Sequence, residues 1–385
     1  MMILRKPISI LTAILFLTSS MVFSASETTD SLHVATAPAT TEVEAHGEHA
    51  EEAKSPKEVV NAHIQHHLQD DYYFTFFADE AEGKHYGFPL PVILIDGGLK
   101  VFSASKFHYG ETVAEVDGKF YKLFHGKIYE TNAAGDLTMD DHHHPTNKMP
   151  LNFSMTKNVV SLILTAAILF FLFVGLAKTY KNGHNNLPKG FSRVLEPLVL
   201  YVRDEIARPN IGEKKYKKFM PYLLTVFFLI WLLNLLGLTP LGINVTGNIA
   251  FTLCTAAFTF FITQFSANKD YWGHIFWMPG VPVPMKIILA PIEVLGMFTK
   301  PFSLMIRLFA NITAGHTVVM GLIAIVFLMK EQLTVGGATA VSLALTLFIS
   351  VIEILVAFLQ AYIFTMLSSL FIGMAVQDHH HDDHH

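Results

Sequence analysis

Residues 307–316 read RLFANITAGH, and they decide the fold because a fixed charge here interrupts sequence that otherwise belongs inside a membrane. The flanking segments, MFTKPFSLMI before it and TVVMGLIAIVFLM after it, are mostly apolar. A charge near the middle of a membrane helix costs at least about 2.5–3.5 kcal/mol. Arg307 is nevertheless present, and it is the only arginine after Arg208. The stretch therefore predicts a functional site inside a membrane domain.

The composition of the whole chain indicates a membrane protein. Apolar residues make up 51% and charged residues 15% of the 385 positions, whereas a soluble domain carries about 25% charged residues. Residues 26–156 hold 21 acidic and 9 basic side chains, and residues 178–219 hold 10 basic and 4 acidic ones. The basic segment flanks apolar spans and lacks interleaved aromatics, so nucleic acid is not an expected partner. The single Cys254 excludes a disulfide framework or a cysteine metal site within one chain.

The N-terminus has the layout of a secretory signal peptide, which we predict over residues 1–25. Arg5 and Lys6 precede a short apolar run, ISILTAILFLTSSMVF, and small residues follow it. An uncleaved anchor helix is the alternative, but the run is short for a full membrane crossing, which takes about 20 residues. A signal peptide indicates that the residues after it are exported.

The exported part is predicted to begin with a disordered segment over 26–55, which is rich in Ala, Thr, Glu and His. Residues 56–145 then form a small extracytoplasmic domain rich in β-strands. This domain opens with a helix over 55–69, capped by Ser55, and ends in a His-rich linker at 140–145. Four segments predict its strands because they alternate or cluster β-branched and aromatic residues: YYFTFF, PLPVILI, KVFSASKF and KFYKLFHGKIYE.

Five apolar segments are predicted to cross the membrane within residues 151–376, and a His-rich tail follows at 377–385. The expected fold is an α-helical polytopic membrane protein whose last two helices are long and strongly tilted, with the small β-rich N-terminal domain attached. An amphipathic helix within 190–209 is expected along the membrane surface. The predicted spans are 158–177, 220–241, 249–267, 286–329 and 338–376.

The length of the fourth span determines its expected tilt. From Glu293 to Met329 it has 37 residues, and an unbroken helix of that length would be about 55 Å long. The hydrocarbon core of a bilayer is only about 30 Å thick. The helix must therefore be strongly tilted, or kinked at Pro291 or Pro301, and a strong tilt is the simpler expectation.

The distribution of charge predicts the orientation in the membrane. Lys and Arg gather on the cytoplasmic side of membrane proteins, so the basic stretch 178–219 is predicted to be cytoplasmic. The N-terminal domain then lies in the periplasm, in agreement with the signal peptide. Five crossings place the C-terminal tail in the cytoplasm, and the expected location is the inner membrane of a bacterium.

The fourth span carries a polar stripe. Glu293, Lys300 and Arg307 are seven residues apart, so they fall within about 20° of one another around a helix. Ser303 and Asn311 lie four residues on either side of Arg307 and extend the same stripe. These five positions therefore share one face of the helix.

Further polar residues lie opposite this stripe and on the last span. His316 is nine residues past Arg307 and faces roughly the other side of the helix, whereas Glu353 and Gln360 are seven apart and share a face. Glu353 and His316 can exchange protons, and Gln360 can orient water or side chains. Arg307 cannot practically lose its proton. A permanent cation beside titratable groups suits a separator between two aqueous half-pathways for protons.

Each of these polar residues also has a simpler explanation. Lys300 can extend its ammonium group to the membrane surface, and Glu293 can lie at the interface. Arg307 can form a structural salt bridge with Glu353, although that leaves the rest of the stripe unexplained. Asn311 can join two helices through a hydrogen bond.

Two long segments, KPFSLMIRLFANITAGH and EILVAFLQAYIFTMLSSLFI, resemble the signature segments of the a subunit of F-type ATP synthase. The segment NLLGLTPLGINVTGNIAFTL resembles that family's turn between two spans. The resemblance covers about residues 151–376, and it is specific because the arginine, asparagine and glutamine recur in register within two long apolar helices. The N-terminal domain lies outside the usual family core.

The resemblance implies a role for each residue that matches the family motif. Arg307 corresponds to the arginine that faces the rotating ring of c subunits. Asn311 corresponds to the asparagine one turn later, and Gln360 to the glutamine near the arginine on the last helix. Glu293 corresponds to an acidic residue on the cytoplasmic side of the proton pathway.

The sequence departs from the family at one pair of positions. Many bacterial members have an acidic residue where this chain has His316 and a histidine where it has Glu353. The acid and the imidazole are both kept, so the resemblance implies that the outer half-channel can keep its chemistry. Asn248, Lys300 and Ser303 are counted as supporting polar positions.

The resemblance implies a stator subunit in the membrane sector of an F-type ATP synthase. Its partners would be the c-subunit ring, the b subunit of the peripheral stalk, the other subunits and the lipid bilayer. Protons would reach a c-subunit carboxylate through the outer half-channel and leave on the cytoplasmic side after the ring has turned, while Arg307 prevents a direct leak. Neither a catalytic site for ATP hydrolysis nor a cofactor is expected in this chain.

Two other classes of function remain as alternatives. A proton-coupled secondary transporter should show internal repeats and broken helices, and no repeat relates the two halves of this sequence. A receptor or assembly protein anchored by its spans should have spans without charges, which the last two helices contradict. The His-rich stretches can bind metal weakly, but without a fixed ligand geometry they are interpreted as solvated tails and no metal site is expected.

Overall fold

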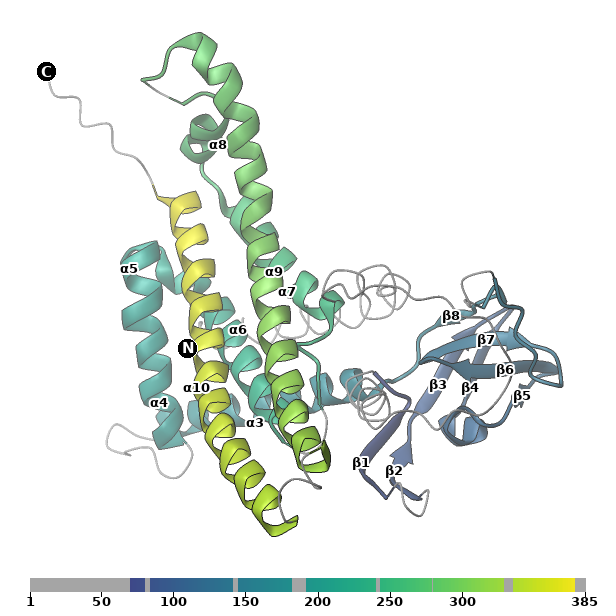
Figure 1. Ribbon diagram of the computed structural model, residues 1–385. Helices are drawn as coiled ribbons and strands as arrows, with labels where there is room; N and C mark the ends of the chain where they lie inside the picture. The colour runs from purple at the N-terminus through teal and green to yellow at the C-terminus, as the bar shows by residue number, and fades with distance from the viewer. Residues whose placement is uncertain are drawn as a thin grey trace, which may run out of the picture.

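The structure is a computed structural model. Figure 1 shows two parts in the described chain: a β-rich domain and a bundle of helices that follows it. The predicted signal peptide, the segment 26–55, the helix over 55–69 and all but the first residue of the tail lie outside the described residues. The structure describes residues 70–79, 84–140, 145–181, 192–239, 243–278, 280–328 and 335–377.

Short strands build the β-rich domain as small antiparallel sheets. The hairpin of β1 and β2 stands alone, and two three-stranded sheets have the orders β4-β3-β8 and β5-β6-β7. The last strand lies beyond residue 145 and leads directly into the first long helix. The strands are β1 Tyr73–Asp79, β2 Lys84–Pro89, β3 Pro91–Ile95, β4 Leu99–Ser103, β5 Ala114–Val116, β6 Lys119–Phe124, β7 Lys127–Thr131 and β8 Leu151–Asn152.

The predicted strand over KVFSASKF is wrong in its second half. The strand ends at Ser103, and Ala104–Gly110 form a 3-10 helix instead. Ser103 caps this helix because its side-chain oxygen accepts a hydrogen bond from the Ser105 amide at 3.3 Å. A serine that binds a nearby backbone amide offers the chain an alternative to the strand ladder.

The alternating apolar residues of β3 and β4 bury one face of their sheet. Val92 and Leu94 are fully buried, and Phe102 of β4 lies opposite Val92 in the register. Tyr121 and Ile128 from the second sheet close the core from the other side. Because side chains alternate between the faces of a strand, this period-two pattern gives the domain a core separate from that of the helices.

One carboxylate at the edge of this core is held by two lysines. Asp96 is 7% exposed, and it accepts hydrogen bonds from Lys119 Nζ at 2.5 Å, Lys148 Nζ at 2.7 Å and the Tyr121 hydroxyl at 3.1 Å. Glu130 forms a second ion pair with Lys119 at 3.0 Å. The hydrogen bonds from Lys119 and then Lys148 hold the pKa of Asp96 well below its usual range. The cluster therefore stabilises the domain only while Asp96 is ionised.

We expect Asp96→Asn to lower the free energy of unfolding of the β-rich domain by about 1.5–3 kcal/mol near neutral pH, the range for hydrogen bonds to a charged group, because the buried carboxylate loses its charge beside two lysines. In the wild type this stabilisation is fully present above about pH 4, the ordinary pKa of Asp, and is lost as the pH falls towards the depressed folded-state pKa. The variant should lack that acid-dependent loss. Urea unfolding of the full chain, followed by hydrogen exchange of β3 and β6 at several pH values, measures both effects.

Asp117→Asn provides the matched control for this prediction. Asp117 is exposed in the turn between β5 and β6 and has a positive φ of 52°, which asparagine also adopts. Its replacement should change the free energy of unfolding by less than about 0.5 kcal/mol. An equal loss in the two variants would show that Asp96 has no special role.

Five helices of the described chain are long and apolar enough to cross a membrane, as predicted. The amphipathic segment before the second of them is also helical, and its last part winds as a π-helix over Val202–Ala207. The long helices are α3 Lys157–Lys181, α6 Tyr216–Gly237, α7 Ile249–Ser266, α9 Val283–Leu328 and α10 Val335–Val376. The shorter ones are α4 Ser192–Tyr201, α5 Arg208–Ile211 and α8 Lys269–Phe276.

Helix α6 forms the centre of the bundle, and most of its side chains are buried. Phe228 packs edge-on against Phe173 of α3, with ring centroids 5.2 Å apart. Phe227 packs in the same way against Phe358 of α10, at 5.8 Å. Aromatic pairs therefore join α6 to both the first and the last long helix.

A buried hydroxyl network connects three of the helices. The Tyr222 hydroxyl of α6 and Thr259 Oγ1 of α7 are 2.7 Å apart, and Thr259 Oγ1 lies 3.3 Å from Ser368 Oγ of α10. All three residues are buried. Hydrogen bonds between buried polar side chains help to hold membrane helices together, so this network fixes α10 against the bundle.

The C-terminal end of α10 is tied to the loops around it. The Asn268 amide donates to the Ala375 carbonyl at 2.9 Å, and Lys215 Nζ donates to the Val376 carbonyl at 2.5 Å. A Cβ added at Gly373 would lie 2.1 Å from the Asn210 carbonyl oxygen of α5, so only glycine fits there. The two hydrogen bonds satisfy carbonyls that the last turn of a helix leaves without partners.

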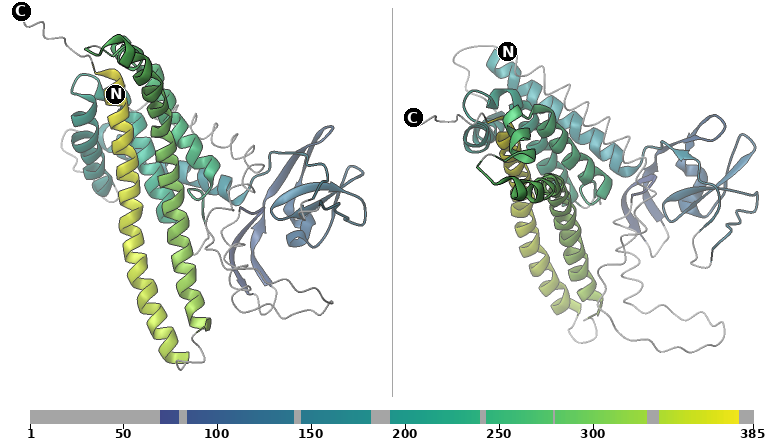
Figure 2. Two further views of the ribbon diagram at one scale, coloured as in Figure 1. Left: turned by 45° about the horizontal axis from the view of Figure 1, so that its top comes forward. Right: turned by 90° about the horizontal axis from the view of Figure 1, so that it is seen from above.

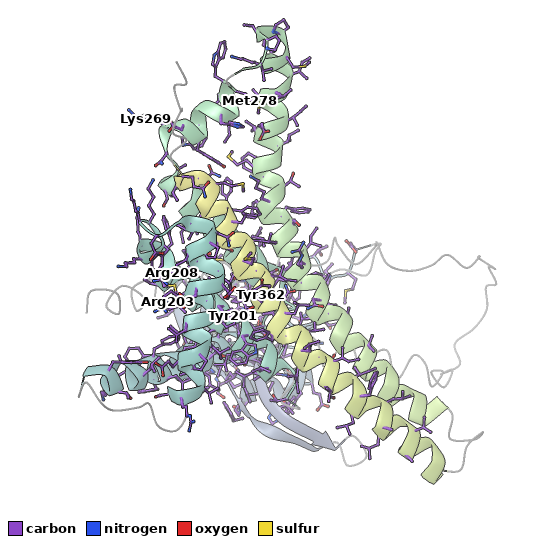
Figure 3. The ribbon with its side chains drawn as sticks, turned by 90° about the vertical axis from the view of Figure 1, so that its left-hand side faces the viewer. Tyr201, Arg203, Arg208, Lys269, Met278 and Tyr362 are labelled. Atoms are coloured by element: carbon purple, nitrogen blue, oxygen red, sulfur yellow. The ribbon has the colours of Figure 1, made fainter. Side chains whose placement is uncertain are left out.

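The basic segment from α4 to α5 lies against one flank of α10. Figure 3 shows Arg203, Arg208, Tyr201 and Tyr362 together on this flank. The Tyr201 and Tyr362 rings have centroids 6.0 Å apart and join α4 to α10. Asp204 pairs with both arginines at 2.8 Å, so part of the positive charge of this segment is neutralised within the chain.

Helices α9 and α10 lie side by side, as Figures 1 and 2 show. Helix α9 is unbroken over 46 residues, which corresponds to about 69 Å. Pro291 and Pro301 lie inside it without ending it. The length predicted from the sequence is therefore confirmed, and one continuous helix carries every polar residue from Glu293 to His316.

Candidate functional site

Arg307 lies on the exposed side of α9. Its side chain is exposed, and none of the ion pairs within the described residues includes it. Glu353 on α10 is half-buried and also makes none of them. Arg307 and Glu353 therefore do not form the structural salt bridge that was the simpler explanation for Arg307. A guanidinium that the described chain leaves unpaired is available to an anionic group from outside it.

One turn from Arg307, an amide bridge joins the two long helices. Asn311 Nδ2 of α9 donates to Gln360 Oε1 of α10 at 3.4 Å. Gln360 is only 4% exposed, and its Nε2 is a buried donor without a partner in the described part of the chain. A buried unpaired donor costs about 1–3 kcal/mol. The structure thus brings together two residues that the sequence spacing placed on separate helices.

The acid and imidazole positions of the predicted pair lie at the same level of the two helices. A Cβ added at Gly315 would be 2.8 Å from Glu353 Oε1, so the carboxylate of α10 rests directly on the backbone of α9. His316 is the next residue along α9, and neighbouring Cα atoms are about 3.8 Å apart. The backbone of His316 is described, whereas its side chain lies outside the described side chains.

The remaining members of the predicted stripe do not share one environment. Ser303 is exposed, whereas Glu293 and Lys300 are half-buried. Lys300 Nζ lies 5.4 Å from the centroid of the Phe371 ring, so its side chain turns towards α10. Asn248 has a local structural contact, because its side chain caps α7 by accepting a hydrogen bond from the Ala250 amide at 2.9 Å.

Two contacts within the helical bundle were not predicted from the sequence. Thr246 Oγ1 donates to Asn234 Oδ1 at 3.0 Å, and this buried bond closes the turn between α6 and α7. Gly315 permits the close approach of Glu353 to α9. An isolated glycine inside a helical pattern can signal such a close approach, but its contact on another helix has no signal in a single sequence.

Comparison with known proteins gives family matches over both parts of the chain. The model of the ATP synthase A chain family matches residues 159–373, which contain most of the helical bundle. A second model, described as a domain of unknown function (DUF8433), matches residues 63–153. That range contains every strand of the β-rich domain, so the boundary between the two families coincides with the start of α3.

Relatives with assigned names are similar to this chain over most of its length. The ATP synthase subunit a of Chlorobium phaeobacteroides strain BS1 is 41% identical over 320 residues, covering 75% of this chain and 92% of that protein. The ATP synthase subunit a 2 of Chlorobaculum tepidum is 48% identical over 239 residues, covering 60% and 66%. The ATP synthase subunit a of Anaeromyxobacter sp. strain Fw109-5 is 41% identical over 283 residues, covering 71% and 64%. The chain therefore belongs to the ATP synthase A chain family, the a subunits of F-type ATP synthase.

Proposed function

We propose that this stator subunit of the membrane sector guides protons to and from a ring of c subunits, with Arg307 as the barrier between two half-channels. The observation that carries the proposal is the exposed guanidinium on α9, which no carboxylate of the described residues pairs with and which lies one turn from the Asn311–Gln360 bridge. An intramembrane cation that is exposed on its helix is stabilised by an anion from a neighbouring subunit. A carboxylate on a passing c subunit meets this need.

The chemistry of Arg307 matches the task of a barrier. Its guanidinium stays protonated at any physiological pH, so it cannot pass a proton along a chain of groups. It attracts a deprotonated carboxylate and disfavours protonation of that carboxylate while the two are close. Gln360 and Asn311 supply amide groups beside it that can orient the guanidinium or the arriving carboxylate.

Glu353 and His316 are the proton-exchanging groups of the proposed outer half-channel. Glu353 rests on the α9 backbone at Gly315, directly beside position 316. An acid and an imidazole at one level of two adjacent helices can hand a proton from one to the other through a short distance or one water. Glu293, two turns nearer the start of α9 than Lys300, is assigned to the proposed inner half-channel.

The proposed orientation follows from the basic loop and the number of crossings. The β-rich domain lies in the periplasm, and the inner end of α10 lies at the cytoplasmic surface. Because α9 is about twice as long as the bilayer core is thick, we propose that α9 and α10 are strongly tilted and follow the curved side of the ring. The b subunit is proposed to contact the bundle elsewhere.

The experiment for this function is passive proton flux through the membrane sector in vesicles from which the catalytic sector has been stripped. We expect Glu353→Gln to reduce the flux at least about tenfold, because loss of one proton-transfer group costs about 10²–10⁴-fold where it acts directly. Ser350→Ala is the matched control. Ser350 lies one turn earlier on α10, and its hydroxyl donates to the Thr346 carbonyl of the same helix at 2.8 Å.

The same assay separates the stator from a transporter. The chain reconstituted without c subunits should carry no protons, since half of the proposed path belongs to the ring. Sustained flux by the chain alone would favour the proton-coupled transporter instead. Unchanged proton flux in the Glu353→Gln variant would show that Glu353 is not part of the proton pathway.

A further inference from the structure

Helix α9 begins well beyond the bundle, and α8 lies beside it there. Figures 1 and 3 show α8 and the first turns of α9 past the C-terminal end of α10. Helix α7 ends at Ser266 beside α10, where the Asn268 amide donates to the Ala375 carbonyl at 2.9 Å. The segment that follows, residues 269–292, is described except for residue 279 and is called the α8–α9 hairpin here. It starts at the membrane surface where α7 and α10 both end.

The α8–α9 hairpin is too apolar to lie in water. From Tyr271 to Ile292, Lys286 is the only Asp, Glu, Lys or Arg. Large apolar side chains on the first turns of α9 are nevertheless exposed, since Ile287 is 70% and Ile288 is 61% exposed. A helix that is apolar around most of its surface belongs inside a protein core or a membrane. This exposed surface therefore needs an apolar environment.

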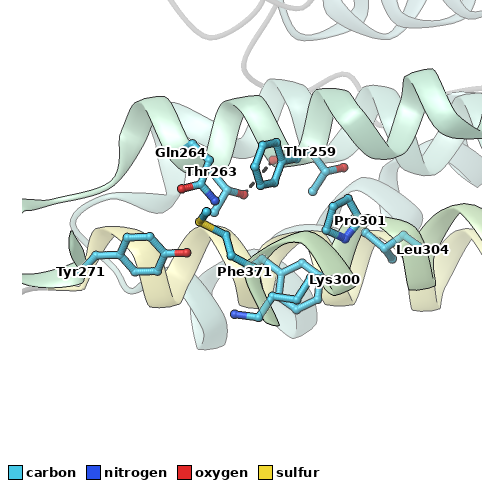
Figure 4. A pocket seen from close by; sticks show the side chains of 10 residues that line it. Thr259, Thr263, Gln264, Tyr271, Lys300, Pro301, Leu304 and Phe371 are labelled. Carbon is cyan, nitrogen blue, oxygen red and sulfur yellow. Dashed lines mark hydrogen bonds between the residues drawn. The ribbon is translucent and has the colours of Figure 1, made fainter. Parts of the chain in front are cut away.

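One face of α8 holds the helix against its neighbours. Ile275 is buried, and Tyr271, one turn before it, lines a small cavity together with Gln264 and Lys300 (Figure 4). Helix α8 contacts both α9 and α10. The rotation of α8 about its own axis is therefore fixed by packing, and so are the directions of its other faces.

The two other faces of α8 have opposite chemistry. Trp272 and Phe276 are four residues apart and exposed, and their rings stack with centroids 6.0 Å apart. Asp270 and His274 are also four residues apart and exposed. At about 100° per residue, the aromatic pair and the polar pair lie about 160° apart around the helix. A helix with an aromatic face opposite a polar face is suited to lie in the plane of a membrane interface.

The turn between the two helices adds another aromatic side chain. Trp277 is 61% exposed, and Lys286 Nζ of α9 lies 4.5 Å from its ring centroid. Tryptophan is enriched at the level of the lipid headgroups, and lysine extends its ammonium group to the same level. The exposed apolar surface continues along α9 through Leu295 and Phe298. It therefore joins the surface of a membrane span without a break.

We infer that the α8–α9 hairpin lies in the plane of the membrane, where phospholipids of the leaflet on this side cover its exposed apolar surface. Trp272, Phe276 and the isoleucines of α9 contact acyl chains, whereas Asp270 and His274 face water. The hairpin thereby fixes the depth at which α9 starts. Interfacial Trp and Lys anchors help to set the tilt of a membrane helix, so the hairpin sets the tilt of α9. This last step rests on the proposed tilt, whereas the lipid contact does not depend on the proton pathway.

The depth of the hairpin is tested with the tryptophans of the full-length chain, reconstituted in phospholipid nanodiscs. The chain has three tryptophans, so three variants that each keep one of them, with Phe at the other two positions, report on Trp272, Trp277 and Trp231 separately. Lipids brominated near the headgroup should quench Trp272 and Trp277 at least about twofold more than lipids brominated near the chain ends, because interfacial side chains stay at headgroup level. Iodide should quench both at least about threefold less than it quenches free tryptophan.

Trp231 is the control for this measurement. It packs against Phe358 within the bundle, with ring centroids 5.9 Å apart, and should not prefer the bromine near the headgroup. Two results for Trp272 and Trp277 would overturn the lipid contact. Strong quenching by iodide without quenching by brominated lipid would place the hairpin in water, and quenching by neither would mean that protein covers it.

The anchoring role is tested with a spin label at position 288 on α9, attached to Ile288→Cys in a Cys254→Ala chain. The accessibility of the label to oxygen is divided by its accessibility to a water-soluble nickel complex, and this ratio falls as the label approaches water. Trp272→Ser with Phe276→Ser should lower the ratio at least about threefold, because α8 then loses its apolar face.

Asp270→Ser with His274→Ser is the matched control, because it changes two exposed residues on the opposite face of the same helix. It should leave the accessibility ratio unchanged. Equal ratios in the two double variants would overturn the anchoring role, since the aromatic face would then not hold the start of α9 in the membrane.

Discussion

Membrane vesicles that carry Arg307→Ala are expected to make no ATP from a proton gradient, with a rate at least about a hundredfold below that of the wild type. In the proposed mechanism the variant leaves a c-subunit carboxylate without its cation, and an uncompensated charge in an apolar setting costs about 3–5 kcal/mol. The complex should still assemble, because the exposed guanidinium makes none of the ion pairs within the described chain. ATP synthesis after an imposed pH jump measures the rate, and gel analysis of the purified complex measures assembly.

Arg193→Ala is the control for Arg307→Ala, since Arg193 is an exposed arginine on α4. Its removal should leave the rate of ATP synthesis within about twofold of the wild type. The two variants should also differ in passive proton leak, which rises only when the barrier is lost. ATP synthesis at the wild-type rate in Arg307→Ala vesicles would contradict the proposed coupling mechanism.

The second large effect is expected from exchanging the acid and the imidazole. The double variant His316→Glu with Glu353→His should make ATP at least about tenfold faster than either single variant, because both proton-exchanging groups are then present again. Residues that act as a pair show coupling of about 0.5–3 kcal/mol in a double-mutant cycle. The adjacency of Glu353 to Gly315 motivates the pairing, since position 316 follows directly on the same helix.

The four chains of this cycle are measured together, by ATP synthesis in vesicles at matched amounts of complex. Ser350→Ala in the double-variant background controls for a general loss of packing along α10. Strictly additive losses, with the double variant no faster than the slower single one, would show that positions 316 and 353 do not act as a pair.

The sequence predicts the membrane part of the fold well because its signal is local. A charge-free apolar run long enough to span a bilayer identifies α3 without any knowledge of its neighbours, and its start was predicted within one residue. The unbroken length of α9 follows from the same kind of reasoning, because two isolated prolines in an apolar run do not have to end a helix. Helical spacing also placed Arg307 and Asn311 on one face of it.

The contacts between distant residues could not be predicted from the same sequence. Lys300 shares a helical stripe with Arg307, yet it turns towards Phe371, which lies 71 positions away in the chain. The contact of Glu353 with the backbone at Gly315 likewise depends on the pairing of α9 with α10. In the β-rich domain the cap at Ser103 outweighed the β-propensity of the following residues. Local sequence patterns predict single helices and strands, whereas contacts such as Lys300–Phe371 and Glu353–Gly315 depend on how two helices pack.

The anchoring of α10 at its C-terminal end has a mechanical consequence. A stator beside a turning rotor experiences a sideways drag, and any yielding of the stator wastes part of the stroke. Gly373 lets α10 pack closely against α5, and Asn268 and Lys215 donate hydrogen bonds to the last carbonyls of α10. One end of α10 is therefore fixed to the rest of the bundle. The Tyr222–Thr259–Ser368 network adds a second support further along. Stiffness at these two supports, distant from the titrating groups, would limit how much torque is stored as bending rather than delivered as rotation.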